Sequence, residues 1–216
     1  DLDDTIYNEK LYVLSGFKLV SYYLKKNFNI DQKQSFLFLK KYFSENGRNK
    51  IFNNILSKYN ILNEVNLKKL ISQYRRHKPN IYLPKESSRV LERLSKKNNL
   101  YLVTDGNKIV QKNKIEALKI KKYFKKILIT HQYGLKFAKP SLYCFKLIKK
   151  YEKCLWVDLI YIADDPTKDF INLNKKGSIT VRIKKGRFAD KKVIKKFDAK
   201  YSIDHLTELF KLNLTN

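Results

Sequence analysis

The chain has 216 residues, of which 43% are hydrophobic and 13% aromatic, which predicts one globular core with room for a smaller inserted domain. No apolar run reaches the roughly 18 to 20 residues that a membrane span needs, and no secretory signal is visible, so we expect no membrane association. Cys144 and Cys154 offer neither a metal-ligand spacing nor a disulfide framework, which favours a reducing, cytoplasmic location.

The chain is strongly basic, with 47 lysines and arginines against 20 aspartates and glutamates and a formal net charge of +27. Arginine accounts for only seven of these cations, and the lysines are spread from Lys10 to Lys211. A solvated surface explains this pattern better than a nucleic-acid site, which would concentrate its charge in one arm or stripe. We therefore do not expect dedicated nucleic-acid binding, although the positive field should attract anionic substrates such as phosphate esters.

Because the sequence contains no methionine, we expect Asp1 to be an interior residue of a longer protein, preceded by a buried apolar strand.

The first part of the chain is predicted to be helical. From Lys10 to His77, apolar residues recur at helical spacing in four segments, with asparagine- and glycine-containing breaks between them and Asp31 as an N-cap. This stretch predicts a unit of four helices.

The pattern changes after Pro79, because a proline and the residue before it disfavour a continued helix. Helices are predicted at 86–97, 108–118, 141–151, 168–175, 191–196 and 204–211. Strands are predicted between them at 100–103, 127–129, 159–162, 179–183 and 199–202. This alternation predicts an α/β fold with a parallel sheet covered by helices on both faces, and sheets of this kind carry active sites at the carboxyl ends of their strands.

Polar residues gather at these strand ends. Asp1 and Asp3 end the expected first strand, Thr104 ends the second, Asp164 ends the fourth, and Lys139 precedes a helix between them. In a parallel sheet these ends converge on one crevice. A pair of carboxylates two residues apart suits phosphoryl transfer, since one can attack phosphorus while the other handles protons and a divalent cation reduces their repulsion. Alone, such a pair could equally cap a helix or lie in a solvated turn.

The order of these motifs resembles the haloacid dehalogenase (HAD) superfamily. The resemblance is carried by Asp-x-Asp-x-Thr at 1–5, a threonine after an apolar strand at 104, Lys-Pro at 139–140, and Asp164 followed by Asp-x-x-x-Asp at 165–169. It covers essentially the whole chain. It implies a Rossmann-like parallel-sheet core formed by residues 1–7 and 80–216, with an α-helical cap of the C1 type inserted as residues 8–79.

The resemblance also implies a reaction. Asp1 corresponds to the nucleophile, and Asp3 to the general acid that protonates the leaving group and then acts as the base that activates water. Family members with an aspartate at the second position are mostly phosphatases and phosphomutases, whereas the dehalogenases lack it. This favours a phosphate ester over a halide as the substrate and argues against a dehalogenase.

Four residues are expected to bind the transferring phosphoryl group. The resemblance implies that Thr104 donates its hydroxyl, helped by backbone N–H groups around Asp105 and Gly106 at the start of a helix. Lys139 would neutralise the nucleophile and the phosphoryl group. As alternatives, Thr104 could serve only in a turn or as an N-cap, and Lys139 could be one more surface lysine.

The same resemblance implies a Mg²⁺ site. Its contacts would be the Asp1 carboxylate, the backbone carbonyl of Asp3 and the Asp164 carboxylate, because hard oxygen ligands suit this cation. Asp165 competes with Asp164 for the ligand role. Asp169 is expected to support the site by orienting the neighbouring lysine or a metal-bound water.

We therefore expect a Mg²⁺-dependent phosphatase that acts on a small phosphorylated metabolite, a sugar phosphate or a nucleoside monophosphate, through an aspartyl-phosphate intermediate. Arg48 and Arg75 in the cap are candidates for reading a second anionic group of the substrate. Two alternatives stay open at this point. One is a phosphomutase with the same residues, and the other is a catalytically vestigial basic protein that binds nucleic acid. The oligomeric state is not predicted.

Overall fold

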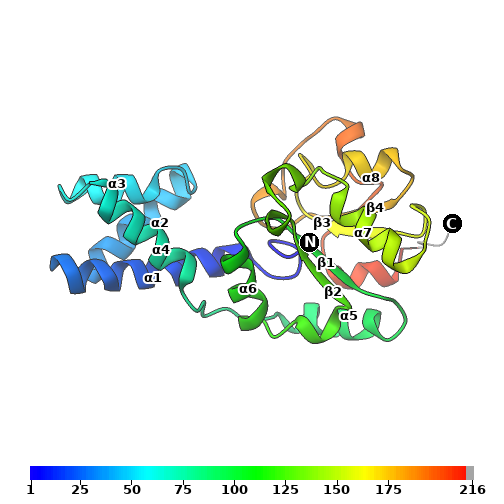
Figure 1. The fold of residues 1–216 in the computed structure, drawn as a ribbon, viewed down its shortest axis with the longest axis horizontal. Helices are drawn as coiled ribbons and strands as arrows, with labels where there is room; N and C mark the ends of the chain where they lie inside the picture. The colour runs from blue at the N-terminus through cyan, green and yellow to red at the C-terminus, as the bar shows by residue number, and fades with distance from the viewer. Residues whose placement is uncertain (213–216) are drawn as a thin grey trace. The chain divides into compact units, whose positions relative to one another are not determined.

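The structure, a computed structural model, describes residues 1–212. Residues 213–216, the end of the segment expected to belong to the core, lie outside the described residues. The chain divides into two compact units, a core unit formed by Asp1–Glu9 with the chain from Tyr82 onward and a helical unit formed by Lys10–Ile81 (Figure 1). In the described part of the chain, no helix combines the length and the apolar character needed to cross a bilayer.

The helical unit contains the four helices that the sequence predicts. They are α1 (Glu9–Phe28), α2 (Gln32–Asn46), α3 (Ile51–Lys58) and α4 (Glu64–Arg76). Asp31 is the N-cap of α2, because its side chain accepts a hydrogen bond from the backbone N–H of Gln34 at 2.7 Å. Asn63 caps α4 in the same way. The starts of α2 and α4 are therefore set by capping side chains that can be read from the sequence.

Aromatic packing around Tyr74 joins α4 to α1 and α3. The ring of Tyr74 lies with its centroid 5.5 Å from that of Tyr12, 6.2 Å from that of Phe17 and 5.2 Å from that of Phe52. A Cβ atom on Gly16 would lie only 2.4 Å from this ring. Glycine at position 16 thus lets α1 and α4 approach closely.

Up to residue 212, the core unit holds five strands and four α-helices. The strands are β1 (Tyr101–Thr104), β2 (Lys126–Ile129), β3 (Ile160–Ala163), β4 (Ile179–Ile183) and β5 (Tyr201–Ile203). The helices are α5 (Lys85–Ser95), α6 (Lys108–Ala117), α7 (Tyr143–Glu152) and α8 (Ile171–Lys175). Strand β1 pairs with β2, and β3, β4 and β5 form a second group in that order. Every pair is parallel, as the sequence predicts.

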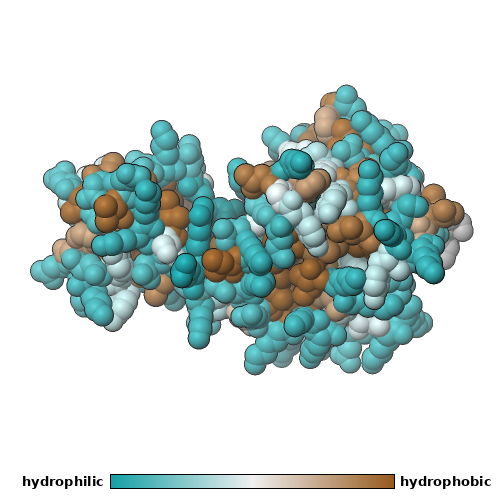
Figure 2. All heavy atoms as spheres, viewed as in Figure 1, coloured by the Kyte–Doolittle hydropathy of each residue, from teal (hydrophilic) through white to brown (hydrophobic). Residues whose placement is uncertain are grey.

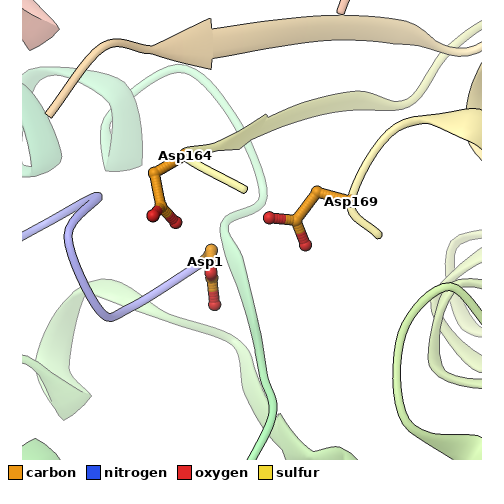
Figure 3. Close-up of side chains that lie close together, drawn as sticks. All are labelled: Asp1, Asp164 and Asp169. Carbon is orange, nitrogen blue, oxygen red and sulfur yellow. The ribbon is translucent and has the colours of Figure 1, made fainter. Parts of the chain in front are cut away.

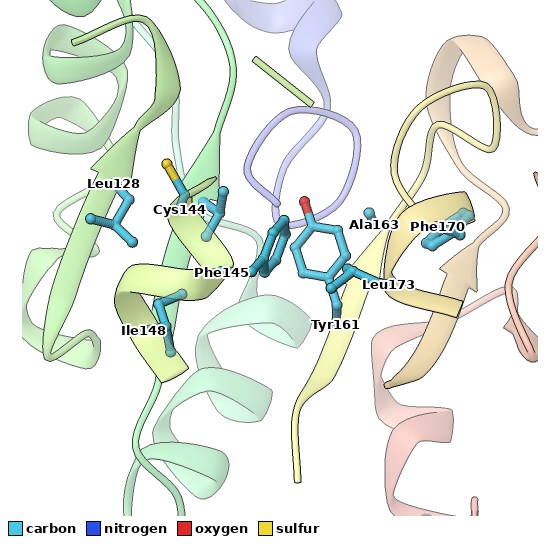
Figure 4. Close-up of a cluster of buried hydrophobic side chains, with 9 residues drawn as sticks. Leu128, Cys144, Phe145, Ile148, Tyr161, Ala163, Phe170 and Leu173 are labelled. Carbon is cyan, nitrogen blue, oxygen red and sulfur yellow. The ribbon is translucent and has the colours of Figure 1, made fainter. Parts of the chain in front are cut away.

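Both groups of strands contribute to one buried cluster, and helices pack on both faces of β3. Tyr161 and Ala163 join this cluster with Val103 of β1 and residues of α7 and α8 (Figure 4). Ile162, between them in the strand, points to the opposite face and packs against a second cluster that includes Val90 of α5. The core unit is therefore a Rossmann-like α/β fold.

Two predicted helices near the end of the chain are wrong. The helix expected at 191–196 is replaced by the single 3₁₀ turn Lys195–Phe197, and the one expected at 204–211 is the 3₁₀ turn Leu206–Phe210. The two buried leucines of the latter are three residues apart, a spacing that a 3₁₀ turn places on one face. The remaining 3₁₀ turns are Lys121–Tyr123, Thr130–Gln132, Leu135–Phe137 and Gly186–Phe188.

Arg182 holds the chain after β4 against the sheet in a non-helical course. This residue is buried in the middle strand of its group, and its Nη2 atom donates to the carbonyl oxygens of Phe188 at 2.6 Å and Lys191 at 2.8 Å. Its Nη1 atom donates to the carboxylate of Asp198 at 3.1 Å. These hydrogen bonds satisfy backbone carbonyl groups of the segment after β4 and hold that segment against the sheet.

The exposed surface is mostly polar. Hydrophilic side chains cover most of the visible face of each unit, and apolar side chains appear there in small groups (Figure 2). This distribution agrees with a lysine-rich sequence whose charges are solvated.

Replacing Arg182 with methionine should lower the free energy of unfolding by about 2–4 kcal/mol, because buried carbonyls and one carboxylate lose their donor. Urea unfolding of the purified protein measures this change. The matched control is Lys184→Met, an exposed lysine just after the same strand, which should have almost no effect. Equal losses in the two variants would contradict the role assigned to Arg182.

Candidate active site

The loop at residues 1–7 is fastened to the carboxyl end of β3. The backbone nitrogen of Asp1 donates to the carbonyl oxygen of Ile162 at 2.9 Å. Leu2 is completely buried, and the backbone carbonyl of Ile6 accepts a 2.6 Å hydrogen bond from the hydroxyl of Ser87 in α5. These contacts fix the direction in which the side chains of the loop point.

Three carboxylates meet beside this loop, and we call them the acidic group. Its members are Asp1, Asp164 at the end of β3, and Asp169 (Figure 3). One carboxylate oxygen from each lies within 4.8 Å of the others. Burial, followed by the charges of Asp169 and Asp4, raises the pKa of Asp164 to about 7. The three groups therefore repel one another when all are ionised.

Lys139 lies against the acidic group. Its ammonium is 3.0 Å from a carboxylate oxygen of Asp1 and 2.7 Å from one of Asp169, and it donates to the hydroxyl of Tyr161 at 3.0 Å. Burial, the largest single effect, would lower the pKa of Lys139, but the charges of Asp169, Tyr161 and Asp105 and the hydrogen bond to Asp169 together outweigh it and hold the pKa above its usual range. Three carboxylates and one ammonium leave uncompensated negative charge, so the acidic group could hold a divalent cation.

Asp165 does not belong to the acidic group. Its carboxylate accepts hydrogen bonds from the backbone N–H of Thr167 at 3.0 Å and from the hydroxyl of the same residue at 2.6 Å. Its own backbone N–H donates to Asp169 at 3.1 Å. Asp165 thus shapes the turn before α8 and positions Asp169, whereas Asp164 is the carboxylate that points to Asp1.

Asp105 connects several loops of the core unit. Its carboxylate accepts hydrogen bonds from the hydroxyl of Thr130 at 2.7 Å, the backbone N–H of Lys139 at 3.1 Å and the ammonium of Lys168 at 2.9 Å. Burial would raise the pKa of Asp105, but the two lysines and these donors lower it overall. Its side chain therefore organises the loop that carries Lys139.

Thr104 is buried at the end of β1, and its hydroxyl oxygen accepts a 2.7 Å hydrogen bond from the side-chain amide of Gln111. The hydroxyl proton is then available for a second partner. Asn107, not Thr104, caps α6, since its side chain accepts from the backbone N–H groups at positions 109 and 110. Gly106 has a φ of 127°, which explains why a glycine stands there.

Two residues of α6 contact Asp3 and were not identified from the sequence. Lys114 donates to both carboxylate oxygens of Asp3, at 2.8 and 2.9 Å, and Gln111 donates to one of them at 3.0 Å. Burial would raise the pKa of Asp3, but the charge of Lys114 and the hydrogen bonds from Lys114, Gln111 and Tyr7 together lower it overall. A signal for both residues exists, because they occupy the buried side of an amphipathic helix, three residues apart and beside Ile115.

The two arginine candidates lie in the helical unit. Arg48 lines a cavity of about 190 Å³ together with Lys50, Phe52 and Tyr74. Arg75 is exposed on α4 and does not line this cavity. The aromatic ring of Tyr74 packs within the unit, as described above.

Comparisons with known proteins identify the family of this chain. Residues 1–182 match the model of the haloacid dehalogenase-like hydrolase family. The glyceraldehyde 3-phosphate phosphatase of Methanocaldococcus jannaschii is 29% identical over 224 residues, which cover 97% of this chain and 92% of that protein.

Solved structures show the same fold. YfnB from Bacillus subtilis, described as a HAD-hydrolase bound to magnesium, is 22% identical with a TM-score of 0.70, covering 98% of this chain and 95% of its own. A 2-haloacid dehalogenase from Pseudomonas syringae is 16% identical with a TM-score of 0.64, covering 98% and 94%. Since the family model spans most of the chain, this protein belongs to the haloacid dehalogenase-like hydrolases.

Proposed function

We propose that this hydrolase is a Mg²⁺-dependent phosphatase that removes the phosphoryl group from a small phosphorylated metabolite. The proposal is carried by two aspartates on one anchored loop, Asp1 and Asp3. Lys139 forms an ion pair with Asp1, and Lys114 forms one with Asp3. Dehalogenases share the fold but lack the second carboxylate of this pair. The similarity to a glyceraldehyde 3-phosphate phosphatase supports a sugar phosphate as substrate, and nucleoside monophosphates are the second class to test.

The chemistry divides between the two aspartates. A carboxylate oxygen of Asp1 attacks phosphorus, and the bond from phosphorus to the ester oxygen breaks. The electron pair of that bond stays on the ester oxygen, which takes a proton from Asp3 and leaves as an alcohol. Water then attacks the aspartyl phosphate and gives a proton to Asp3, and the bond from phosphorus to Asp1 breaks. Phosphate leaves, and both aspartates return to their starting states.

Donors around the Asp3 carboxylate favour its ionised form, which is the form that accepts a proton from the attacking water in the second half of the cycle. Asp3 enters the first half protonated, because it gives its proton to the leaving ester oxygen. Thr104 would donate its hydroxyl proton to a phosphoryl oxygen, with backbone N–H groups around Asp105 and Gly106 as further donors. Lys139 would neutralise charge on Asp1 and the phosphoryl group.

The acidic group fits Mg²⁺. Its members offer hard carboxylate oxygens, and the pKa of Asp164 is raised to about 7 by burial and then by the negative charges of Asp169 and Asp4, against which Lys139 acts. Asp1 and Asp164 would hold the ion with the backbone carbonyl of Asp3, and Asp169 would hold Lys139 or a water of the ion. When bound, Mg²⁺ would offset the repulsion between the attacking carboxylate and the phosphate dianion.

The helical unit is proposed to act as the cap, with residues 8–79 as its extent in the sequence. A cap excludes water from the reaction and supplies substrate contacts. Arg48 and Arg75 remain the candidates for a second anionic group, and the cavity beside Arg48 supports the former more.

The Asp1→Asn variant should lose phosphatase activity by at least about a thousandfold, because the amide cannot attack phosphorus. Phosphate release from p-nitrophenyl phosphate and from a panel of sugar and nucleoside phosphates, each with Mg²⁺, measures this loss. The control is Asp190→Asn, an exposed aspartate in the same unit, which should keep full activity.

Persistent turnover in Asp1→Asn would contradict the nucleophile. Transfer of the phosphoryl group back to substrate in the presence of a bisphosphate primer would identify a phosphomutase instead. If the wild-type protein turns over no phosphate ester but binds RNA tightly and with a strong salt dependence, the result would favour the alternative of a catalytically vestigial protein that binds nucleic acid.

Mg²⁺ should raise the melting temperature, and the increase should be larger near pH 8 than near pH 5. The pKa of Asp164 is raised from 3.8 to about 7 in the folded protein. Between these values the folded state keeps a proton that the unfolded state has lost, so the stability of the metal-free protein falls as the pH rises. Near pH 5 the cation must displace that proton.

Thermal unfolding with and without Mg²⁺ at the two pH values measures the effect. Asp164→Asn should remove most of the increase, whereas Asp190→Asn should retain it. An increase that is equal at both pH values, or that survives in Asp164→Asn, would show that the cation binds elsewhere.

A further inference from the structure

Both oxygens of the Asp3 carboxylate are held by donors from the core unit. The hydroxyl of Tyr7 donates to Oδ1 at 2.8 Å, the ammonium of Lys114 donates to Oδ1 and Oδ2, and the amide of Gln111 donates to Oδ2 at 3.0 Å. A free carboxylate turns readily about its last side-chain bond. Donors on both oxygens restrict that rotation, so the plane of the Asp3 carboxylate is fixed.

Lys114 is placed where it can act only through other residues. Its side chain is 2% exposed, whereas that of Asp3 is 21% exposed. Burying an ammonium is costly, and the ion pairs with Asp3 and with Glu9 at 3.2 Å offset that cost. Asp3 thus keeps an open side toward solvent, while Lys114 approaches it from the protein interior.

Gln111 connects Asp3 to the phosphate-binding residues. Its amide nitrogen lies within hydrogen-bond distance of the Asp3 carboxylate, of the Thr104 hydroxyl oxygen at 2.7 Å and of the Asp105 carbonyl oxygen at 2.7 Å. The amide group lies at the meeting point of the first loop and the end of β1. It therefore fixes the position of Asp3 relative to Thr104.

We propose that Lys114 and Gln111 are positioning residues that hold the Asp3 carboxylate at the open side of the site, in the orientation from which it exchanges a proton with the ester oxygen of the substrate. The inference rests on the proposed phosphatase function, and it assigns these two residues of α6 a part in proton transfer instead of in phosphate binding. Proton transfer tolerates little error in orientation, because the donor and acceptor must approach to hydrogen-bond distance.

Leaving groups of different basicity separate this role from a merely structural one. The pKa of phenol is about 10, as for the tyrosine side chain. Phenolate is therefore a basic leaving group that needs a proton as it leaves. The p-nitrophenolate ion is much more stable and can leave without one. The two aryl phosphates are otherwise alike, and kcat/KM reports the steps up to the departure of the phenol.

The experiment compares kcat/KM for phenyl phosphate and p-nitrophenyl phosphate, with Mg²⁺, in the wild type and in variants of the whole chain. Lys114→Met should lower kcat/KM for phenyl phosphate about tenfold or more and that for p-nitrophenyl phosphate by less than about threefold. Gln111→Leu should show the same selectivity with a smaller loss. The matched control, Lys112→Met, changes an exposed lysine on the same helix and should change neither value.

A second comparison asks whether Lys114 acts through Asp3. In an Asp3→Asn background, adding Lys114→Met should cause no further loss with phenyl phosphate, because the group that it positions is gone. Equal losses with the two aryl phosphates, or the same loss in both backgrounds, would overturn the inference. If Lys114→Met does not fold, as judged by circular dichroism, Gln111→Leu alone carries the leaving-group test.

Failure of this inference can be told apart from failure of the proposed function. A wild type without turnover of either aryl phosphate, or an active Asp1→Asn variant, would refute the phosphatase. An active wild type and an inactive Asp1→Asn variant, with no selective loss in Lys114→Met and Gln111→Leu, would refute only the positioning role.

Discussion

The ion pairs of Lys139 are the interaction on which the candidate site depends. One buried ammonium lies 3.0 Å from Asp1 and 2.7 Å from Asp169, and the backbone N–H of the same lysine donates to the Asp105 carboxylate. Removing this charge would leave three carboxylates facing one another in a buried place, which is strongly unfavourable. The same excess of negative charge is what makes the place suitable for a divalent cation. The same arrangement of charges therefore stabilises the folded site and suits the proposed chemistry.

A second buried lysine gives the two aspartates of the first loop different surroundings. Asp1 faces the acidic group and Lys139, whereas Asp3 faces Lys114 from α6. In the proposed mechanism the first attacks phosphorus and the second exchanges protons, although they are identical side chains two residues apart. Because the fold is shared with a dehalogenase, the fold alone does not select the reaction. The environment of these individual carboxylates is what supports phosphate chemistry.

The sequence predicts the parallel strands well, because short apolar runs between helical segments leave few alternatives. It also predicts that polar residues at their carboxyl ends approach one another, as Asp1 and Asp164 do. Lys114 is easily overlooked in the sequence: the periodicity of α6 places it on the buried side of the helix, but a lysine on a helix normally signals an exposed face. Nor does the sequence reveal that Arg182 binds carbonyls of the following segment, which is not an α-helix. The partners of both residues lie on other segments of the chain, and local periodicity does not identify them.

The most direct test of the account is to trap the covalent intermediate. The enzyme is mixed with Mg²⁺ and a substrate that carries a radioactive phosphoryl group, quenched in acid within the first turnover, and digested. The account predicts a label on the peptide that contains Asp1, released by hydroxylamine as expected for an acyl phosphate, and absent from Asp1→Asn. A fully active enzyme without this label, or a label that persists in Asp1→Asn, would contradict the assignment of Asp1 as the nucleophile.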